Sequence, residues 1–162
     1  MKNDVLTTAM KNSISDVLET MFFLSLDFFH NDADIRDLWT MGKDQIVAAK
    51  LNFSGPLSGY AIFCIPKKSA VSITADFMGK DEHEISNDQI NGTVKEIINM
   101  IIGNTFSMYD PDVVFDLGVP ELVAFNDFLK ELSDSEKRFS VVIETLENYM
   151  AFQLKVKLWK QI

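Results

Sequence analysis

The chain has little cysteine, little histidine and a deficit of positive charge. Its one cysteine, Cys64, excludes an internal disulfide, and its place in the apolar run of residues 60–65 predicts a buried hydrophobe. His30 and His83 have no partners at metal-ligand spacing beyond a loop acid or two, so no metal site is predicted. The net charge of −9 argues against nucleic acid and against anionic membranes as partners.

The chain also lacks long hydrophobic runs and the common catalytic motifs. The apolar run of residues 21–29 is too short to span a bilayer and contains Asp27. The first residues lack the apolar core and cleavage site of a signal peptide. Nucleophile-elbow, phosphate-loop and dinucleotide-binding patterns are missing. We therefore expect a soluble, cytoplasmic protein without membrane insertion.

The composition is that of a globular protein with one core. Hydrophobic residues make up 47% of the chain, and a single domain over residues 1–162 is expected. Periodicity predicts helices over residues 5–26, 69–78 and 86–108, and strands over residues 46–53, 60–65, 139–144 and 152–158. Residues 113–115 are expected to form a short strand and residues 126–132 a helical turn or two.

The predicted elements follow the order helix–hairpin–helix, then helix–hairpin. This order predicts a degenerate internal repeat with halves at about residues 1–80 and 81–162. The expected fold class is α+β: a pseudo-repeat of a helix plus an antiparallel β-hairpin, with long helices packed on one face of an antiparallel sheet.

The most informative segment is residues 92–104, in the last long helix. Glu96, Asn99 and Gly103 lie at i, i+3 and i+7, so they share one stripe, which Gly92 extends. The opposite side carries an apolar band of Ile90, Val94, Ile97, Ile98, Ile101 and Thr105. Glycine inside a helix costs about 1 kcal/mol against alanine, so two glycines on an exposed stripe indicate that another molecule comes close.

The first predicted helix carries a stripe with the same spacing. Ser15, Glu19, Phe22 and Leu26 take the places of Gly92, Glu96, Asn99 and Gly103 in that order. Since phenylalanine replaces the amide and leucine the second glycine, this stripe is expected to bury an aromatic ring or to be inert.

These features together resemble the CheC/CheX/FliY family of CheY-P phosphatases, and CheX-like members in particular. The family helix reads Asp or Ser, three residues, Glu, two residues, Asn, three residues, Gly, and Glu96, Asn99 and Gly103 match it. Residues 17–22 and the helix end at residues 76–79 are also similar. Two departures are that Gly92 stands at the Asp or Ser position, and that the first helix lacks the Asn of a two-site member.

The resemblance implies hydrolysis of an aspartyl phosphate on a CheY-type response regulator. Asn99 would orient the attacking water, Glu96 would pair with the regulator's lysine, and Gly92, Lys95 and Gly103 would contact the partner. The resemblance also implies that the regulator supplies Mg²⁺, that this chain needs no cofactor, and that it forms a homodimer.

Two other functions fit the same residues. The helix could dock a response regulator or a flagellar-switch partner without hydrolysis, as a binding module. Alternatively, the chain could be a structural dimer whose polar stripe is solvated, although a solvated helix has no use for glycine.

Overall fold

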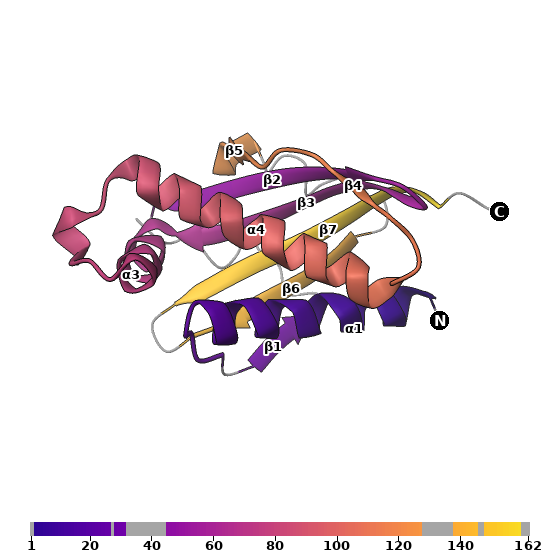
Figure 1. The fold of residues 1–162 in the computed structure, drawn as a ribbon, viewed down its shortest axis with the longest axis horizontal. Helices are drawn as coiled ribbons and strands as arrows, with labels where there is room; N and C mark the ends of the chain where they lie inside the picture. The colour runs from indigo at the N-terminus through magenta and orange to yellow at the C-terminus, as the bar shows by residue number, and fades with distance from the viewer. Residues whose placement is uncertain (1, 27, 32–44, 128–137, 146–147, 160–162) are drawn as a thin grey trace.

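A computed structural model describes residues 2–26, 28–31, 45–127, 138–145 and 148–159. Its helical elements are α1 (Lys2–Ser15), η1 (Asp16–Met21), α3 (Lys67–Met78), η2 (Glu82–Glu84) and α4 (Asn87–Tyr109). Its strands are β1 (Phe28–Asn31), β2 (Ile46–Ser54), β3 (Leu57–Pro66), β4 (Asp116–Leu117), β5 (Glu121–Val123), β6 (Arg138–Glu144) and β7 (Tyr149–Trp159). The helices α1, α3 and α4 lie on one side of a single sheet (Figure 1).

The sheet has the strand order β1-β6-β7-β3-β2-β4, with β5 also paired to β2, and the described pairs are antiparallel. Its two long hairpins, β2–β3 and β6–β7, join where β3 pairs with β7, and Phe63 lies opposite Phe152 there. The order is symmetric about this central pair, with a hairpin and then short strands on each side. An internal repeat would produce this symmetry, but the repeat and the single domain remain predictions.

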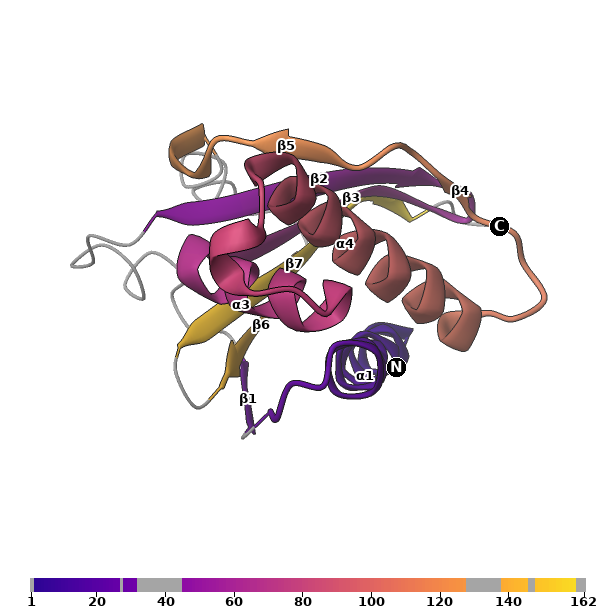
Figure 2. The same ribbon diagram turned by 60° about the vertical axis from the view of Figure 1, so that its left-hand side comes forward.

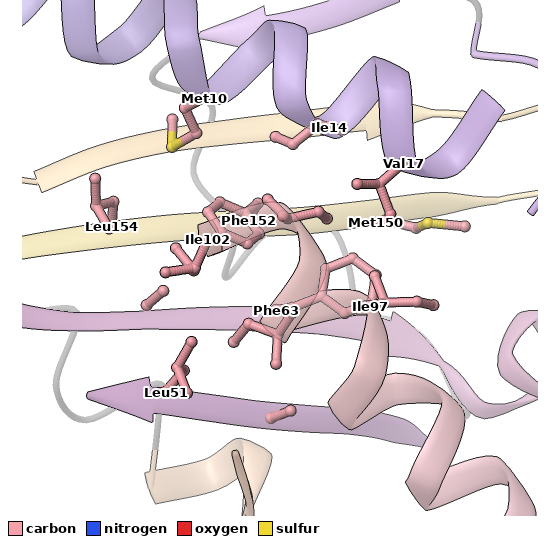
Figure 3. Packing of buried hydrophobic residues seen from close by; sticks show 14 of the residues in the cluster. Met10, Ile14, Val17, Leu51, Phe63, Ile97, Ile102, Met150, Phe152 and Leu154 are labelled. Carbon is pink, nitrogen blue, oxygen red and sulfur yellow. The ribbon is translucent and has the colours of Figure 1, made fainter. Parts of the chain in front are cut away.

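The main core lies between the helices and one face of the sheet. Side chains alternate along β3, so Ala61, Phe63 and Ile65 enter this core, whereas Ile62 and Cys64 belong to a cluster on the other face. Figure 3 shows residues of α1, η1, α4 and three strands meeting in the main core: Met10, Ile14, Val17, Ile97, Ile102, Leu51, Phe63 and Phe152.

The second face of the sheet also carries a buried apolar cluster, to which Ala48, Tyr60, Ile62 and Cys64 contribute. Cys64 is buried, and its burial raises the pKa of the thiol well above its usual range. The thiol therefore stays protonated and unreactive, which confirms the prediction of a buried hydrophobe.

The predicted α+β class and the packing of helices on one face of an antiparallel sheet are confirmed (Figures 1 and 2). Both predicted hairpins and the helices over residues 69–78 and 86–108 are present, with bounds shifted by a few residues. Gly79 ends α3 in the left-handed conformation, with φ of 65°. None of the described helices combines the length and apolar character that a membrane span requires.

One predicted helix is shorter and less regular than expected, and one predicted strand is absent. The helix over residues 5–26 is α-helical only to Ser15, continues as the π-helical η1 to Met21, and ends before Phe23, which has a φ of 56°. The strand predicted at residues 113–115 is absent, because Phe115 stacks on the Phe106 ring of α4 and strand pairing with β2 starts only at Asp116. Residues 125–127 are helical, and the rest of the turn predicted at residues 126–132 lies outside the described residues.

Candidate functional site

Helix α4 carries the candidate site, and its ends are fixed by local hydrogen bonds. At the start, the Gln89 backbone N–H donates to the Ser86 hydroxyl at 3.2 Å, and the Ser86 N–H donates to Gln89 Oε1 at 2.9 Å. The two bonds form a capping box, and Ser86 with Gln89 three residues later is the sequence pattern for one. At the end, the Asp110 N–H donates to the Phe106 carbonyl at 3.0 Å, and Pro111 follows. The helix therefore has a defined length and phase.

The buried side of α4 fixes its rotation about its own axis. The predicted apolar band is confirmed, and Thr93, Ile102 and Phe106 are buried with it. The Ser13 hydroxyl of α1 donates to the Ile101 carbonyl at 2.6 Å and Thr105 donates to the same carbonyl at 2.7 Å, so this buried oxygen is satisfied twice. Phe106 packs against Phe53 of β2, with ring centroids 4.7 Å apart. With this face locked into the core, the opposite face has a fixed orientation.

The stripe of Gly92, Glu96, Asn99 and Gly103 lies on the outer side of α4. Glu96 and Gly92 are exposed, and Asn99 and Gly103 are half-buried. The carboxylate and the carboxamide are one helical turn apart, so a single bound group can contact both.

Neither glycine of the stripe is needed for packing within this chain. A Cβ atom placed on Gly92 or on Gly103 would meet nothing within 4 Å among the described residues. Glycine in a helix is less stable than alanine, and at these two open positions no packing contact within the chain requires it. A partner that packs closely against α4 would explain both glycines, because it would occupy the space beside the helix backbone.

The stripe offers recognition and positioning chemistry. Glu96 can accept charge-assisted hydrogen bonds from a cation, and the Asn99 carboxamide can donate and accept at the same time without ionising. Lys95, half-buried, lies one residue before Glu96 and so projects from the flank of the stripe. The stripe itself contains no Cys, His or Ser nucleophile.

Potential metal ligands group elsewhere in the described part of the chain. Asp81, His83 and Glu84, all exposed and in or beside η2, place one ligand atom each within 4.8 Å of one another. Exposed acidic groups of this kind are common without an ion, so they do not change the expectation that this chain holds no metal.

The matching stripe of the first helix does not form as a surface. Phe22 is buried at 3% exposure, and its ring centroid lies 5.0 Å from that of Phe77 in α3. Glu19 is exposed on η1, whereas Leu26 lies beyond the end of the helix and is half-buried. The aromatic at the position equivalent to Asn99 is therefore part of the core.

Sequence reasoning did not identify Phe23 as a surface residue. Phe23 is 79% exposed, and its backbone is left-handed. It is the one non-glycine residue with a positive φ among the residues that the structure describes. The apolar residues around Phe23 have the pattern of a buried helix. No sequence pattern shows that a phenylalanine will have a positive φ.

Comparison with known proteins points to one family. The family model of the chemotaxis phosphatase CheX matches residues 47–144, more than half of the chain and including the stripe. No curated protein matches.

Solved structures with the same fold come from proteins of low sequence identity. The CheX of Borrelia burgdorferi, solved in complex with CheY, BeF3 and Mg²⁺, has a TM-score of 0.71 and 15% identity over 93% of this chain and 97% of that chain. A CheC-like protein from Shewanella sp. PV-4 has a TM-score of 0.70 and 14% identity, covering 94% and 97%. FliY of Thermotoga maritima has a TM-score of 0.57 and 12% identity, covering 95% and 86%.

Proposed function

Because this chain belongs to the CheX family of chemotaxis phosphatases, we propose that it hydrolyses the aspartyl phosphate of a CheY-type response regulator. The observation that carries the proposal is the outward stripe of α4, which presents one carboxylate and one carboxamide on a helix of fixed rotation. Phosphoryl transfer needs mainly positioning and charge stabilisation, which such a stripe can provide without a nucleophile of its own.

In this proposal Asn99 orients the attacking water. Its carboxamide accepts a hydrogen bond from the water and donates one toward the phosphoryl oxygens, so the water is held in line with the phosphorus atom. The helix backbone beneath Asn99 is held by the core contacts of Ile98, Ile101 and Ile102. Because the side chain starts from a fixed backbone, less orientational entropy is lost when the water is bound.

Glu96 is proposed to pair with the lysine of the regulator's active site. An ion pair one helical turn from Asn99 would set both the distance and the rotation of α4 over the phosphoryl group. The open space at Gly92 and Gly103 would let the partner's backbone approach α4 on both sides of this pair. Lys95 would contact the acidic or polar rim of the partner.

The Mg²⁺ of the reaction is proposed to be held by the regulator. The stripe offers Glu96 as its one carboxylate, whereas Mg²⁺ sites usually combine one or two carboxylates with phosphate oxygens and waters. The ion would neutralise charge on the phosphoryl group, and this chain would add the amide and the ion pair. A homodimer and a cytoplasmic location are part of the same proposal.

A binding module without catalysis is the second candidate. One observation favours it: Gly92 stands where the family pattern has Asp or Ser. A binder would use the same stripe, so the geometry of α4 fits this function too.

The decay of a phosphorylated regulator separates the two functions. CheY-type regulators of the source organism are phosphorylated with a small-molecule phosphodonor, and loss of the phosphoryl group is followed with and without this protein. A phosphatase accelerates the decay at substoichiometric concentration, with multiple turnovers. A protein that binds the regulator but leaves the decay rate unchanged, or slows it, is a binding module.

A further inference from the structure

Four large apolar side chains are exposed where η1 meets α3. Phe23 is 79% exposed, Phe77 is 52%, Met21 is 44% and Met78 is 39%. Phe77 packs against the buried Phe22 and so joins the two elements, and Met21, Phe23 and Met78 are chain neighbours of this pair. We call these four residues the aromatic patch. Exposed apolar side chains that lie together mark interaction sites, whereas single ones are ordinary on a solvated surface.

The backbone at Phe23 is held in a conformation that is unfavourable for a phenylalanine. Its φ of 56° is left-handed, which glycine adopts freely and residues with a Cβ do not. The chain is fixed there because the Leu24 N–H donates to the Leu18 carbonyl at 2.9 Å. The ring faces solvent, so no burial within this protein offsets the backbone strain. Strained residues of this kind cluster at binding sites.

The aromatic patch lies beside the Glu96 end of the α4 stripe. Figure 1 shows α1 and α4 running antiparallel, and the hydrogen bond from Ser13 to Ile101 aligns them. Met21 lies eight residues beyond Ser13, which brings it level with the part of α4 between Gly92 and Glu96. Both η1 and α3, which carry the patch or flank it, contact α4, and packed helix axes are about 8–10 Å apart.

A partner that reaches Glu96 and Asn99 would also cover the patch. A standard protein interface buries about 800 Å² on each partner, which corresponds to a disc of about 16 Å radius. Beside Phe23 there is a hollow of about 220 Å³, lined by Leu24, Ile73 and Met150 together with serine hydroxyls. Such a hollow can receive an apolar side chain of the partner.

We propose that the aromatic patch is a second contact surface for the phosphorylated regulator, with Phe23 as its anchor. This inference rests on the proposed function. Aromatic side chains are enriched among the residues that carry most of the energy of an interface. A second copy of this chain is a poorer occupant, because a copy seated on the patch would cover the α4 stripe and block the proposed reaction.

The test uses the full chain and CheY-type regulators of the source organism, activated with BeF3 and Mg²⁺ for binding and phosphorylated for turnover. Phe23→Ser and Phe77→Ser are expected to weaken binding of the activated regulator about tenfold or more, while kcat at saturation stays within about twofold. Phe23→Gly relieves the backbone strain and removes the ring, so it is expected to weaken binding equally. The matched control is Val114→Ser, which removes an exposed apolar side chain beyond the far end of α4.

The outcomes distinguish this inference from the proposed function. If Phe23→Ser and Phe77→Ser bind like the wild type while the wild type hydrolyses the phosphate, the patch is not a contact surface and the proposed function stands. If these variants change the sedimentation of the free protein but not its affinity for the regulator, the patch is a self-association surface and the inference is wrong. A wild type that binds none of the regulators overturns both.

Discussion

The two long helices of this protein start from matched stripes and end with opposite roles. In α4 the helix runs unbroken past Glu96, Asn99 and Gly103, and its outer side carries a carboxylate and a carboxamide. In the first half the α-helix ends at Ser15 and the chain continues as the π-helical η1. Phe22, which follows η1, is buried in the core. The same spacing of side chains thus gives an outward polar stripe in one place and a packing contact in the other.

The difference comes from one side chain and from the local backbone. An amide at the position of Phe22 would be buried without a partner, which costs free energy, whereas a phenylalanine there buries a large apolar surface against Phe77. The π-helical turn gives the chain a different phase from that of an α-helix, so Leu26 cannot continue the stripe as Gly103 does. Residues at this spacing therefore share one surface only where the helix that bears them stays regular and exposed.

The largest expected effect concerns stability in the first half. Phe22→Ala removes a buried ring, so the free energy of unfolding is expected to fall by about 3 kcal/mol. Phe23→Ala, one residue on, removes an exposed ring and is expected to change stability by less than about 0.5 kcal/mol. Urea unfolding of the two variants measures the difference, and equal losses would show that Phe22 is not the core residue of the pair.

The next largest effect is on regulator binding, and it distinguishes Glu96 from Glu19. Glu96→Ala is expected to weaken binding of the activated regulator by about 2 kcal/mol, or about 30-fold, because the partner's lysine loses its counter-charge. Glu19→Ala, at the equivalent position of the first half, should leave both binding and turnover unchanged. Titration calorimetry gives both affinities. A large loss of activity in a folded Glu19→Ala variant would reveal a second working site, against this account.

Gly103 tests whether the open space on α4 is used. Gly103→Leu is expected to weaken regulator binding about tenfold, since the side chain fills space that the partner's backbone would occupy. The matched control is Asn104→Leu, a substitution of the exposed neighbour off the stripe, which should bind like the wild type. If Gly103→Leu also binds normally, the glycine has no docking role.

The smallest expected effect is a change in stability at Gly103. Gly103→Ala is expected to raise the free energy of unfolding by up to about 1 kcal/mol, because alanine reduces the backbone entropy of the unfolded chain and its Cβ meets no described atom. Thermal melting measures the change. A variant that melts at a lower temperature would mean that Gly103 is packed within this protein.

The sequence predicted those parts of the fold whose signals are local. The capping box of Ser86 and Gln89, the helix end at Gly79 and the alternation over residues 139–144 and 152–158 all follow from neighbouring residues. The π-helical turn after Ser15 and the φ of Phe23 depend on packing between distant elements, such as the contact of Phe22 with Phe77. No local pattern encodes such contacts.

The candidate site was predictable in its position and less so in its role. Helical periodicity was sufficient to place Glu96 and Asn99 on a side of α4 opposite Ile97 and Ile101. The roles of these residues depend on groups that the partner would supply, a phosphoryl group, a lysine and a metal ion, and the chain's own contacts do not specify them. The roles of Glu96 and Asn99 therefore stay predictions.

The most direct test of the account is the rate at which Asn99→Ala dephosphorylates a phosphorylated CheY-type regulator. Loss of the amide should slow multiple-turnover decay by about 10²-fold or more, with an unchanged melting temperature and with binding of the activated regulator largely retained. Asn104→Ala, which removes an exposed amide from the same helix but off the stripe, should act like the wild type. An Asn99→Ala protein that hydrolyses the phospho-regulator at the wild-type rate would contradict the account.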